Sequence, residues 1–159
     1  MIRVCFPSVM QSRCLHQNAG QRTFVVVLET GDEAVECIER FVREHRISAA
    51  QITAIGAFAT AVLRYFDWKT KQYCDLPVHE QVEVASLIGD VAEGTDGGPS
   101  LHIHLVVGRQ DGTAIAGHLG KGYVRPTLEA IVTESPAHLR KRKDPESGLA
   151  LIRPEAASL

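Results

Sequence analysis

The stretch SLHIHLVVGRQDGTAIAGHLGKG, residues 100–122, decides the fold that we predict for this chain. In its first half, apolar residues alternate with a second set of positions that includes His102 and His104. This period of two indicates a β-strand with one apolar face and one face that carries imidazoles. A turn follows at 110–112, and a second β-rich run contains His118. We therefore predict an antiparallel hairpin that carries three of the seven histidines of the chain.

The length of the turn decides whether His118 can join the other two histidines. A two-residue loop would place His118 opposite Leu105, on the wrong face of the hairpin. A three-residue loop, with Gly112 in the left-handed conformation, would place His118 opposite His104 and diagonal to His102. Directly opposed residues have Cβ atoms only about 5 Å apart. The three-residue loop is therefore the condition under which all three imidazoles reach one ion.

Three converging imidazoles are typical of a metal site. Neutral imidazole is the commonest ligand nitrogen, and three of them with a vacant fourth position describe an open zinc-type site. Nickel, copper and iron accept the same donors, so we expect a divalent metal cofactor, with zinc as the first candidate. The alternative is that His102, His104 and His118 are polar residues on the solvated face of the hairpin. We favour the metal site because a single plausible register brings the three together.

Composition and charge are those of a globular protein with one domain. The 159 residues can bury a single core, and 45% hydrophobic and 23% charged residues are ordinary values. A net charge of −2 and a pI near 6.4 argue against a surface dominated by basic residues, which nucleic-acid binding would favour. The four cysteines form no C-x-x-C pair, which predicts reduced thiols and a cytoplasmic location. Because no apolar run has the length of a membrane span, we expect no membrane partner.

Upstream of the hairpin, β-rich runs surround one helix. The helix is predicted over 31–46, opened by a capping box of Thr30 and Glu33 and ending near His45. Gly56 lies within an expected strand, where another backbone would approach closely. Strands are expected over residues 23–29, 49–57, 60–67, 71–76 and 80–89, followed by a polar loop over 90–98.

Downstream of the hairpin we expect a turn-rich connector over 120–126 and a last strand over 128–134. The tail contains the basic run Arg140–Lys143, which would either contact phosphates or form a solvated tail balanced by Asp144 and Glu146. We favour the solvated tail.

The fold class predicted from these elements is α+β, with an antiparallel or mixed sheet of about seven strands packed by one main helix. The predicted organisation is an N-terminal arm (1–21), a single domain (22–153) and a C-terminal tail (154–159).

Several short segments occur in an order that is typical of a known family. No single motif is specific, but together they resemble the PPC (plants-and-prokaryotes-conserved) domain over about residues 22–153. After the helix that follows Gly31, the segments are IGA at 55–57, EVASLIG at 83–89, LHIH at 101–104, GHL at 117–119, VRP at 124–126 and VTE at 132–134. The segment DPESGL at 144–149 resembles one near the end of stand-alone bacterial members.

The resemblance implies an α+β fold that assembles as a homotrimer. Stand-alone bacterial members are classed as DNA-binding through their kinship with nuclear proteins of land plants, in which the domain follows AT-hook motifs. This chain contains no Arg-Gly-Arg-Pro core of an AT-hook, so DNA is expected as a partner by family analogy only. The paired glycine that precedes the third histidine in the family is Ala116-Gly117 here.

The resemblance also assigns roles to individual residues. It implies that His102, His104 and His118 are the metal ligands. Arg125, the arginine before proline, is a candidate for binding an anion such as a small carboxylate, or else a structural ion-pair partner. Glu134 is a candidate acceptor that would orient a ligating imidazole or Arg125.

Competing functions follow from these residues. The first is a homotrimeric binding module with a histidine-lined metal site. The alternative is a metal-dependent enzyme that acts on a small carboxylate-bearing substrate with the same three histidines. A cupin-type enzyme fits less well because 105–110 contains no glutamate. Direct DNA binding has only the basic run at 140–143 in its favour. The sequence leaves open whether the protein is an enzyme.

Overall fold

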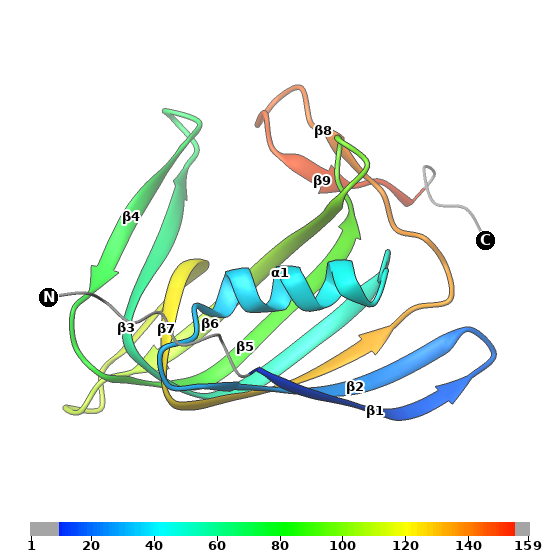
Figure 1. Cartoon of the computed structure of the whole chain (residues 1–159). Coiled ribbons are helices and arrows are strands. Elements are labelled where there is room, and N and C mark those ends of the chain that lie inside the picture. The colour runs from blue at the N-terminus through cyan, green and yellow to red at the C-terminus, as the bar shows by residue number, and fades with distance from the viewer. Residues whose placement is uncertain (1–9, 155–159) are drawn as a thin grey trace, which may run out of the picture.

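The computed structural model describes residues 10–154, and within them one helix lies against a large antiparallel sheet (Figure 1). The elements are β1 (Gln11–Asn18), β2 (Gln21–Glu29), α1 (Ala34–Glu44), β3 (Ala50–Asp67), β4 (Gln72–Val78), β5 (Val82–Glu93), β6 (Pro99–Gly108), β7 (Ala114–Glu134), β8 (Lys141–Lys143) and β9 (Ala150–Ile152). The expected seven-stranded sheet and single main helix are confirmed, although the molecule is richer in β-structure than a balanced α+β fold.

The strand order is β1-β2-β7-β6-β5-β3-β4, and an additional pairing joins β7 to β3. Strands β3, β5, β6 and β7 therefore form a closed ring of antiparallel pairs. The β3–β4 hairpin projects from this ring as an arm, while β8 and β9 form a separate two-stranded sheet (Figure 1). Closure fixes the position of β7 from both sides, because β6 and β3 both pair with it around His118.

Helix α1 covers one face of the sheet and buries a stripe of side chains there. The spacing of this stripe is that of an amphipathic helix, as the sequence predicts, and Cys37 joins it. Phe41 meets Phe24 of β2 edge to face, with 5.3 Å between the ring centroids. The buried helical residues are Ala34, Cys37, Ile38, Phe41 and Val42. The opposite face of the sheet is thus left without a helix among the described residues.

The start of α1 differs from the predicted capping box, whereas its end at His45 agrees. The N-cap is Glu33, whose Oε2 accepts a hydrogen bond from the backbone N–H of Glu36 at 2.9 Å. Its Oε1 accepts a second one from Gly122 N–H at 2.8 Å, which ties the helix to β7. The Thr30 hydroxyl instead donates to the backbone carbonyl of Pro126. The prediction for Thr30 was wrong because a tertiary contact outside the local sequence engages its side chain.

Two strands are longer than predicted. The runs at 49–57 and 60–67 form the single strand β3, which bends at register shifts around Gly56. The connector expected at 120–126 is part of β7. Gly56 adopts φ +152°, and a Cβ there would lie 2.2 Å from the carbonyl oxygen of Thr127. The predicted close approach of another backbone at Gly56 is therefore confirmed.

Both ends of the chain contribute strands. Strand β1 lies within the region assigned to an N-terminal arm and forms an exposed edge of the sheet. Residues 1–9 of that arm and 155–159 of the predicted tail lie outside the described residues.

The basic run at 140–143 is not a solvated tail. Its residues Lys141–Lys143 form β8, and Lys141 is buried there. No helix among residues 10–154 is long and apolar enough to cross a membrane.

Candidate metal centre

The β6–β7 turn has the three-residue form that brings the histidines together. Arg109 N–H donates to Thr113 O at 2.8 Å, and Gly112 N–H donates to Arg109 O at 3.0 Å. Gly112 has φ +81°, the left-handed conformation that glycine adopts at low cost. Asp111 Oδ1 accepts from both the backbone N–H and the hydroxyl of Thr113. The predicted loop is confirmed, and it places His104 directly opposite His118.

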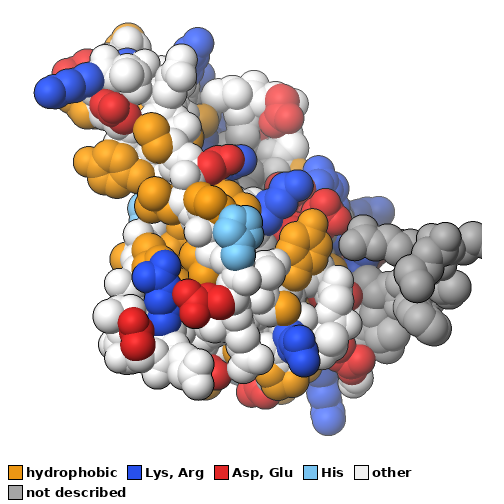
Figure 2. All heavy atoms as spheres, turned by 90° about the vertical axis from the view of Figure 1, so that its left-hand side faces the viewer, with side chains coloured by type: hydrophobic (Ala, Val, Ile, Leu, Met, Phe, Trp, Pro, Cys, Tyr) orange, Lys and Arg blue, Asp and Glu red, His pale blue; other side chains and the backbone are white. Residues whose placement is uncertain are grey.

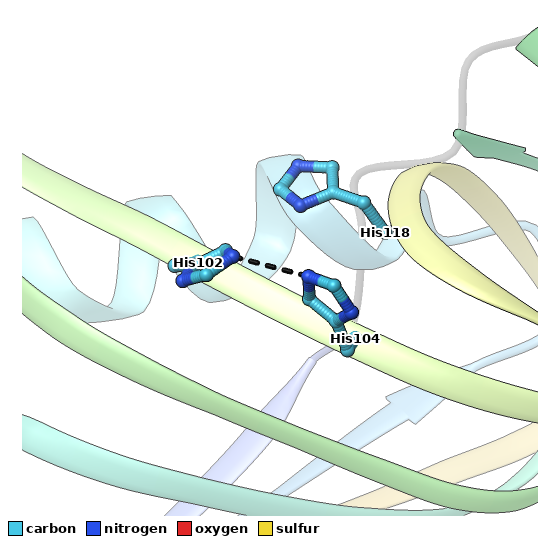
Figure 3. Close-up of side chains that lie close together, drawn as sticks. All are labelled: His102, His104 and His118. Carbon is cyan, nitrogen blue, oxygen red and sulfur yellow. Dashed lines mark hydrogen bonds between the residues drawn. The ribbon is translucent and has the colours of Figure 1, made fainter. Parts of the chain in front are cut away.

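The three imidazoles converge on the face of the sheet opposite α1. Figure 3 shows His102 and His104 on β6 and His118 on β7, with their rings directed toward one another. The three ring centroids lie 4.9 to 5.5 Å apart. One potential ligand nitrogen from each ring lies within 4.8 Å of the other two. We call this set the histidine triad. Three nitrogens bound to one ion at about 2 Å lie closer together than this, so rotations of the side chains would bring the rings inward around it.

One contact inside the histidine triad depends on a shared proton. His102 Nε2 and His104 Nε2 lie 3.1 Å apart, so one nitrogen must donate to the other. An ion bound by both nitrogens would replace that proton. His118 Nδ1 is buried and has no hydrogen-bond partner among the described residues. A cluster with one orphaned nitrogen and one shared proton fits a bound divalent metal.

The surroundings of two of the three imidazoles, those of His104 and His118, favour the neutral form that binds metals. Burial, and after it the charges of the neighbouring His102 and His104, lower the pKa of His118 to about 4. Burial and the charge of His102 also lower the pKa of His104. Unprotonated imidazole offers a lone pair to a metal, whereas imidazolium does not. At neutral pH, His104 and His118 are therefore neutral imidazoles, which bind an ion once the ligating nitrogen carries no proton.

Three side chains missed by the sequence analysis border the histidine triad. Tyr73 on β4 lies against His118, with 5.2 Å between the ring centroids. Asp90 on β5 lies directly across from His102, and Lys141 on β8 forms an ion pair with Asp90. Asp90 was assigned to a polar loop because the predicted strand ended at Gly89. The acidic residue opposite a histidine becomes visible only when β5 is extended and its register with β6 is known.

The β3–β4 hairpin that carries Tyr73 has an apolar surface. Figure 2 views the molecule from the side of this hairpin and shows hydrophobic side chains gathered along it. The exposed large ones are Tyr65, Trp68, Tyr73 and Leu76. Phe66 contacts both Trp68 and Tyr73 edge to face. A row of aromatic rings thus leads from the hairpin to the histidine triad.

The structure does not bring Arg125 or Glu134 to the histidine triad within one subunit. Arg125 is exposed and lies seven residues beyond His118 on the same strand, up to about 23 Å away at the rise of an extended chain. Glu134 lies at the far end of β7, where it is buried in an ion pair with Arg22, which donates from Nη2 to Oε1 at 2.8 Å. Arg22 is a further residue that sequence reasoning missed.

The fold and the histidine triad define a class of protein: an antiparallel β-domain with a three-imidazole cluster on its open face. The model of the Plants and Prokaryotes Conserved (PCC) domain matches residues 15–136 of the chain. This protein therefore belongs to the PCC domain family, as the sequence resemblance indicates under the abbreviation PPC.

Solved structures share the fold over nearly the whole chain. A "putative DNA-binding protein" from Bacteroides thetaiotaomicron is 28% identical, with a TM-score of 0.82 over 92% of this chain and 98% of that one. A plant- and prokaryote-conserved protein from Pyrococcus horikoshii is 30% identical, with a TM-score of 0.78 over 83% and 91% of the two chains. A metal-containing protein from Archaeoglobus fulgidus is 33% identical, with a TM-score of 0.77 over 91% and 98%.

A curated relative matches over a shorter part of its own length. The Bifunctional protein GlmU of Synechococcus sp. (strain JA-3-3Ab) is 29% identical over 130 residues, which make up 80% of this chain and 20% of that protein. The chain thus spans about a fifth of the length of this relative.

Proposed function

We propose that this protein is a homotrimeric binding module in which each subunit holds one divalent metal ion through His102, His104 and His118. The observation that carries the metal site is the convergence of three imidazoles from two strands. One of them, His118, has a buried nitrogen with no hydrogen-bond partner within residues 10–154. Three nitrogen donors with a free fourth position suit zinc and also accept nickel, copper or iron. The similarity to a metal-containing protein from A. fulgidus supports the proposal.

The face that carries the histidine triad supports a homotrimer. Cross-strand pairing aligns Ile131, Thr53, Ile88 and His104 in one row across β7, β3, β5 and β6. On this face the side chains of Ile55 and Ile88 are 61% and 57% exposed, and those of Val106 and Ile131 are also exposed. Contiguous apolar side chains of this kind mark protein–protein contacts. We therefore assign this face to contacts between subunits.

The proposed relation to DNA is indirect and acts through partner proteins. Structures of similar chains are named as putative DNA-binding proteins. In this chain, however, the basic run that would contact phosphates is partly neutralised. Lys141 is buried against Asp90, and Arg140 forms an ion pair with Glu93. The net charge of −2 gives no further electrostatic attraction to DNA.

The catalytic alternative gains no support from the geometry. It requires an anion-binding group beside the metal, and Arg125 lies away from the histidine triad of its own subunit. Among the described residues, Arg64 and Lys141 are the cations whose charges act on His118. Each already forms an ion pair, Arg64 with Asp75 and Lys141 with Asp90. We therefore propose a binding function for the metal site and not a reaction.

The direct test is the metal content of protein purified without an affinity tag. We expect about one zinc or other divalent ion per subunit in the wild type and in His138→Ala, which removes an exposed histidine outside the histidine triad. His104→Ala should contain none. Equal metal content in the wild type and His104→Ala, or none in either after reconstitution, would refute the site. Sedimentation of the wild type and Ile88→Glu tests the homotrimer. A glutamate at position 88 would be buried between the subunits, so the variant should sediment as a smaller species.

A further inference from the structure

Asp90 faces the outer nitrogen of one candidate ligand. Its Oδ2 lies 3.4 Å from His102 Nδ1, and the two residues are directly opposed across β5 and β6. The other ring nitrogen of His102, Nε2, points to His104. The imidazole thus has a carboxylate on one side and the centre of the histidine triad on the other.

Lys141 holds this carboxylate from the opposite side. Its side chain is only 4% exposed, and Nζ lies 3.2 Å from Asp90 Oδ1. The same ammonium donates to the carbonyl oxygen and the hydroxyl of Ser100 at 3.3 and 3.4 Å. Ser100 lies on β6, two residues before His102, so Lys141 joins β5 to β6 beside the histidine triad.

Further contacts anchor the C-terminal hairpin that carries Lys141. Glu93 N–H donates to Leu139 O at 2.8 Å, and Glu93 also forms an ion pair with Arg140. Both contacts lie at the end of β5, three residues from Asp90. The match to the family model ends at residue 136, before this hairpin. The match to the family model therefore assigns no role to Lys141.

These contacts place Asp90 where an outer carboxylate orients a ligating imidazole. A carboxylate that accepts the Nδ1 proton fixes the ring orientation and leaves Nε2 unprotonated for the metal. We propose that Asp90 is a positioning residue for His102, and that Lys141 of the C-terminal hairpin holds Asp90 in place. This inference rests on the proposed metal site. The proposal gives one residue of the basic run at 140–143 a role at the metal site, because Lys141 holds the carboxylate of Asp90.

The tautomer of His102 tests the inference without any metal. In ¹⁵N spectra of the metal-free protein, recorded at a pH where His102 is neutral, we expect the Nδ1-protonated form in the wild type. Asp90→Ala should give a mixture of tautomers, whereas Asp90→Asn should retain the wild-type form because its amide oxygen still accepts the proton. An unchanged tautomer in Asp90→Ala would overturn the proposal. A merely structural role for Asp90 would not produce this pattern of loss and rescue.

Zinc affinity, measured by competition with a chromophoric chelator, tests whether the positioning of His102 by Asp90 strengthens metal binding. We expect Asp90→Ala to bind zinc about 10- to 100-fold more weakly than the wild type. Lys141→Met should weaken binding by a smaller factor. Lys143→Met, a lysine exposed on the same strand, is the matched control and should leave the affinity unchanged.

The two proposals fail in different ways. Absence of zinc binding in the wild type would refute the metal site itself, and the tautomer measurement would still decide the role of Asp90. Wild-type zinc affinity in both Asp90→Ala and Lys141→Met would refute the positioning role while leaving the histidine triad intact. Thermal melts of each variant separate a loss of fold from a loss of affinity.

Discussion

Replacing Gly56 with alanine should open the ring of strands that positions His118. Gly56 has φ +152°, a conformation that residues with a Cβ rarely adopt. The new Cβ would lie 2.2 Å from Thr127 O and 2.8 Å from Leu128 Cα. Because real Cβ contacts below 3.0 Å essentially do not occur, β7 would have to move away from β3 by about 0.8 Å or more. Both obstructing atoms belong to the backbone, so a change of side-chain rotamer cannot relieve the clash.

The expected loss of stability is large. The strained backbone costs about 1–3 kcal/mol, and overpacking adds about 1–3 kcal/mol. We therefore expect Gly56→Ala to lower the free energy of unfolding by about 4 kcal/mol, a large part of the roughly 5–15 kcal/mol that stabilises a typical domain. Urea denaturation followed by far-ultraviolet circular dichroism measures this change. Protein concentration must be held constant, since assembly would couple unfolding to concentration.

Gly108→Ala is the matched control for this experiment. Nothing lies within 4 Å of a Cβ built at Gly108, and its φ is outside the left-handed region. We expect a change below about 0.5 kcal/mol in its free energy of unfolding. If Gly56→Ala also cost less than about 1 kcal/mol, β3 and β7 would not approach as closely as described, and the reasoning about ring closure would be wrong.

Two other predictions concern ion pairs and hydrogen bonds away from the histidine triad. Arg22→Met leaves the buried Glu134 carboxylate without its partner and should lower the free energy of unfolding by about 3 kcal/mol. Adding Glu134→Gln should recover part of that loss, and no recovery in the double variant would contradict the ion-pair explanation. In the β8–β9 turn, backbone and hydroxyl hydrogen bonds from Ser147 lower the pKa of Asp144. These hydrogen bonds therefore stabilise the folded protein at pH values above the ordinary pKa of an aspartate carboxyl. The stabilisation is lost as the pH falls through the lowered pKa of Asp144. Ser147→Ala should raise the pKa of Asp144, as measured from its carboxyl chemical shift, and an unchanged value would refute this account.

The β6–β7 hairpin could be predicted from sequence because its information is local. Alternation of apolar and polar residues indicated the first strand, and a β-rich run indicated the second. A three-residue loop with Gly112 in the left-handed conformation then defined the register that the structure has. The convergence of His104 and His118 follows from that register alone. The helix was predictable for the same reason, because its apolar stripe repeats at helical spacing over a short segment.

Features that depend on distant partners were not predictable in this way. Glycines and a proline in 120–126 are typical of a connector, yet pairing with β3 makes this segment part of β7. Thr30 has a good capping sequence, but its hydroxyl donates to Pro126 O. Lys141 lies in a run of charges that resembles a solvated tail, and only the docking of β8 shows its contact with Asp90.

X-ray absorption at the zinc edge tests the central claim most directly. The zinc-loaded wild type should show three imidazole nitrogens at about 2.0–2.1 Å, and His118→Ala should lose one of them. None of the described cysteines, Cys14, Cys37 and Cys74, belongs to the histidine triad, so a sulfur ligand at about 2.3 Å would place the ion elsewhere. Such a sulfur signal, or an unchanged spectrum in His118→Ala, would contradict the assignment of the histidine triad as the metal centre.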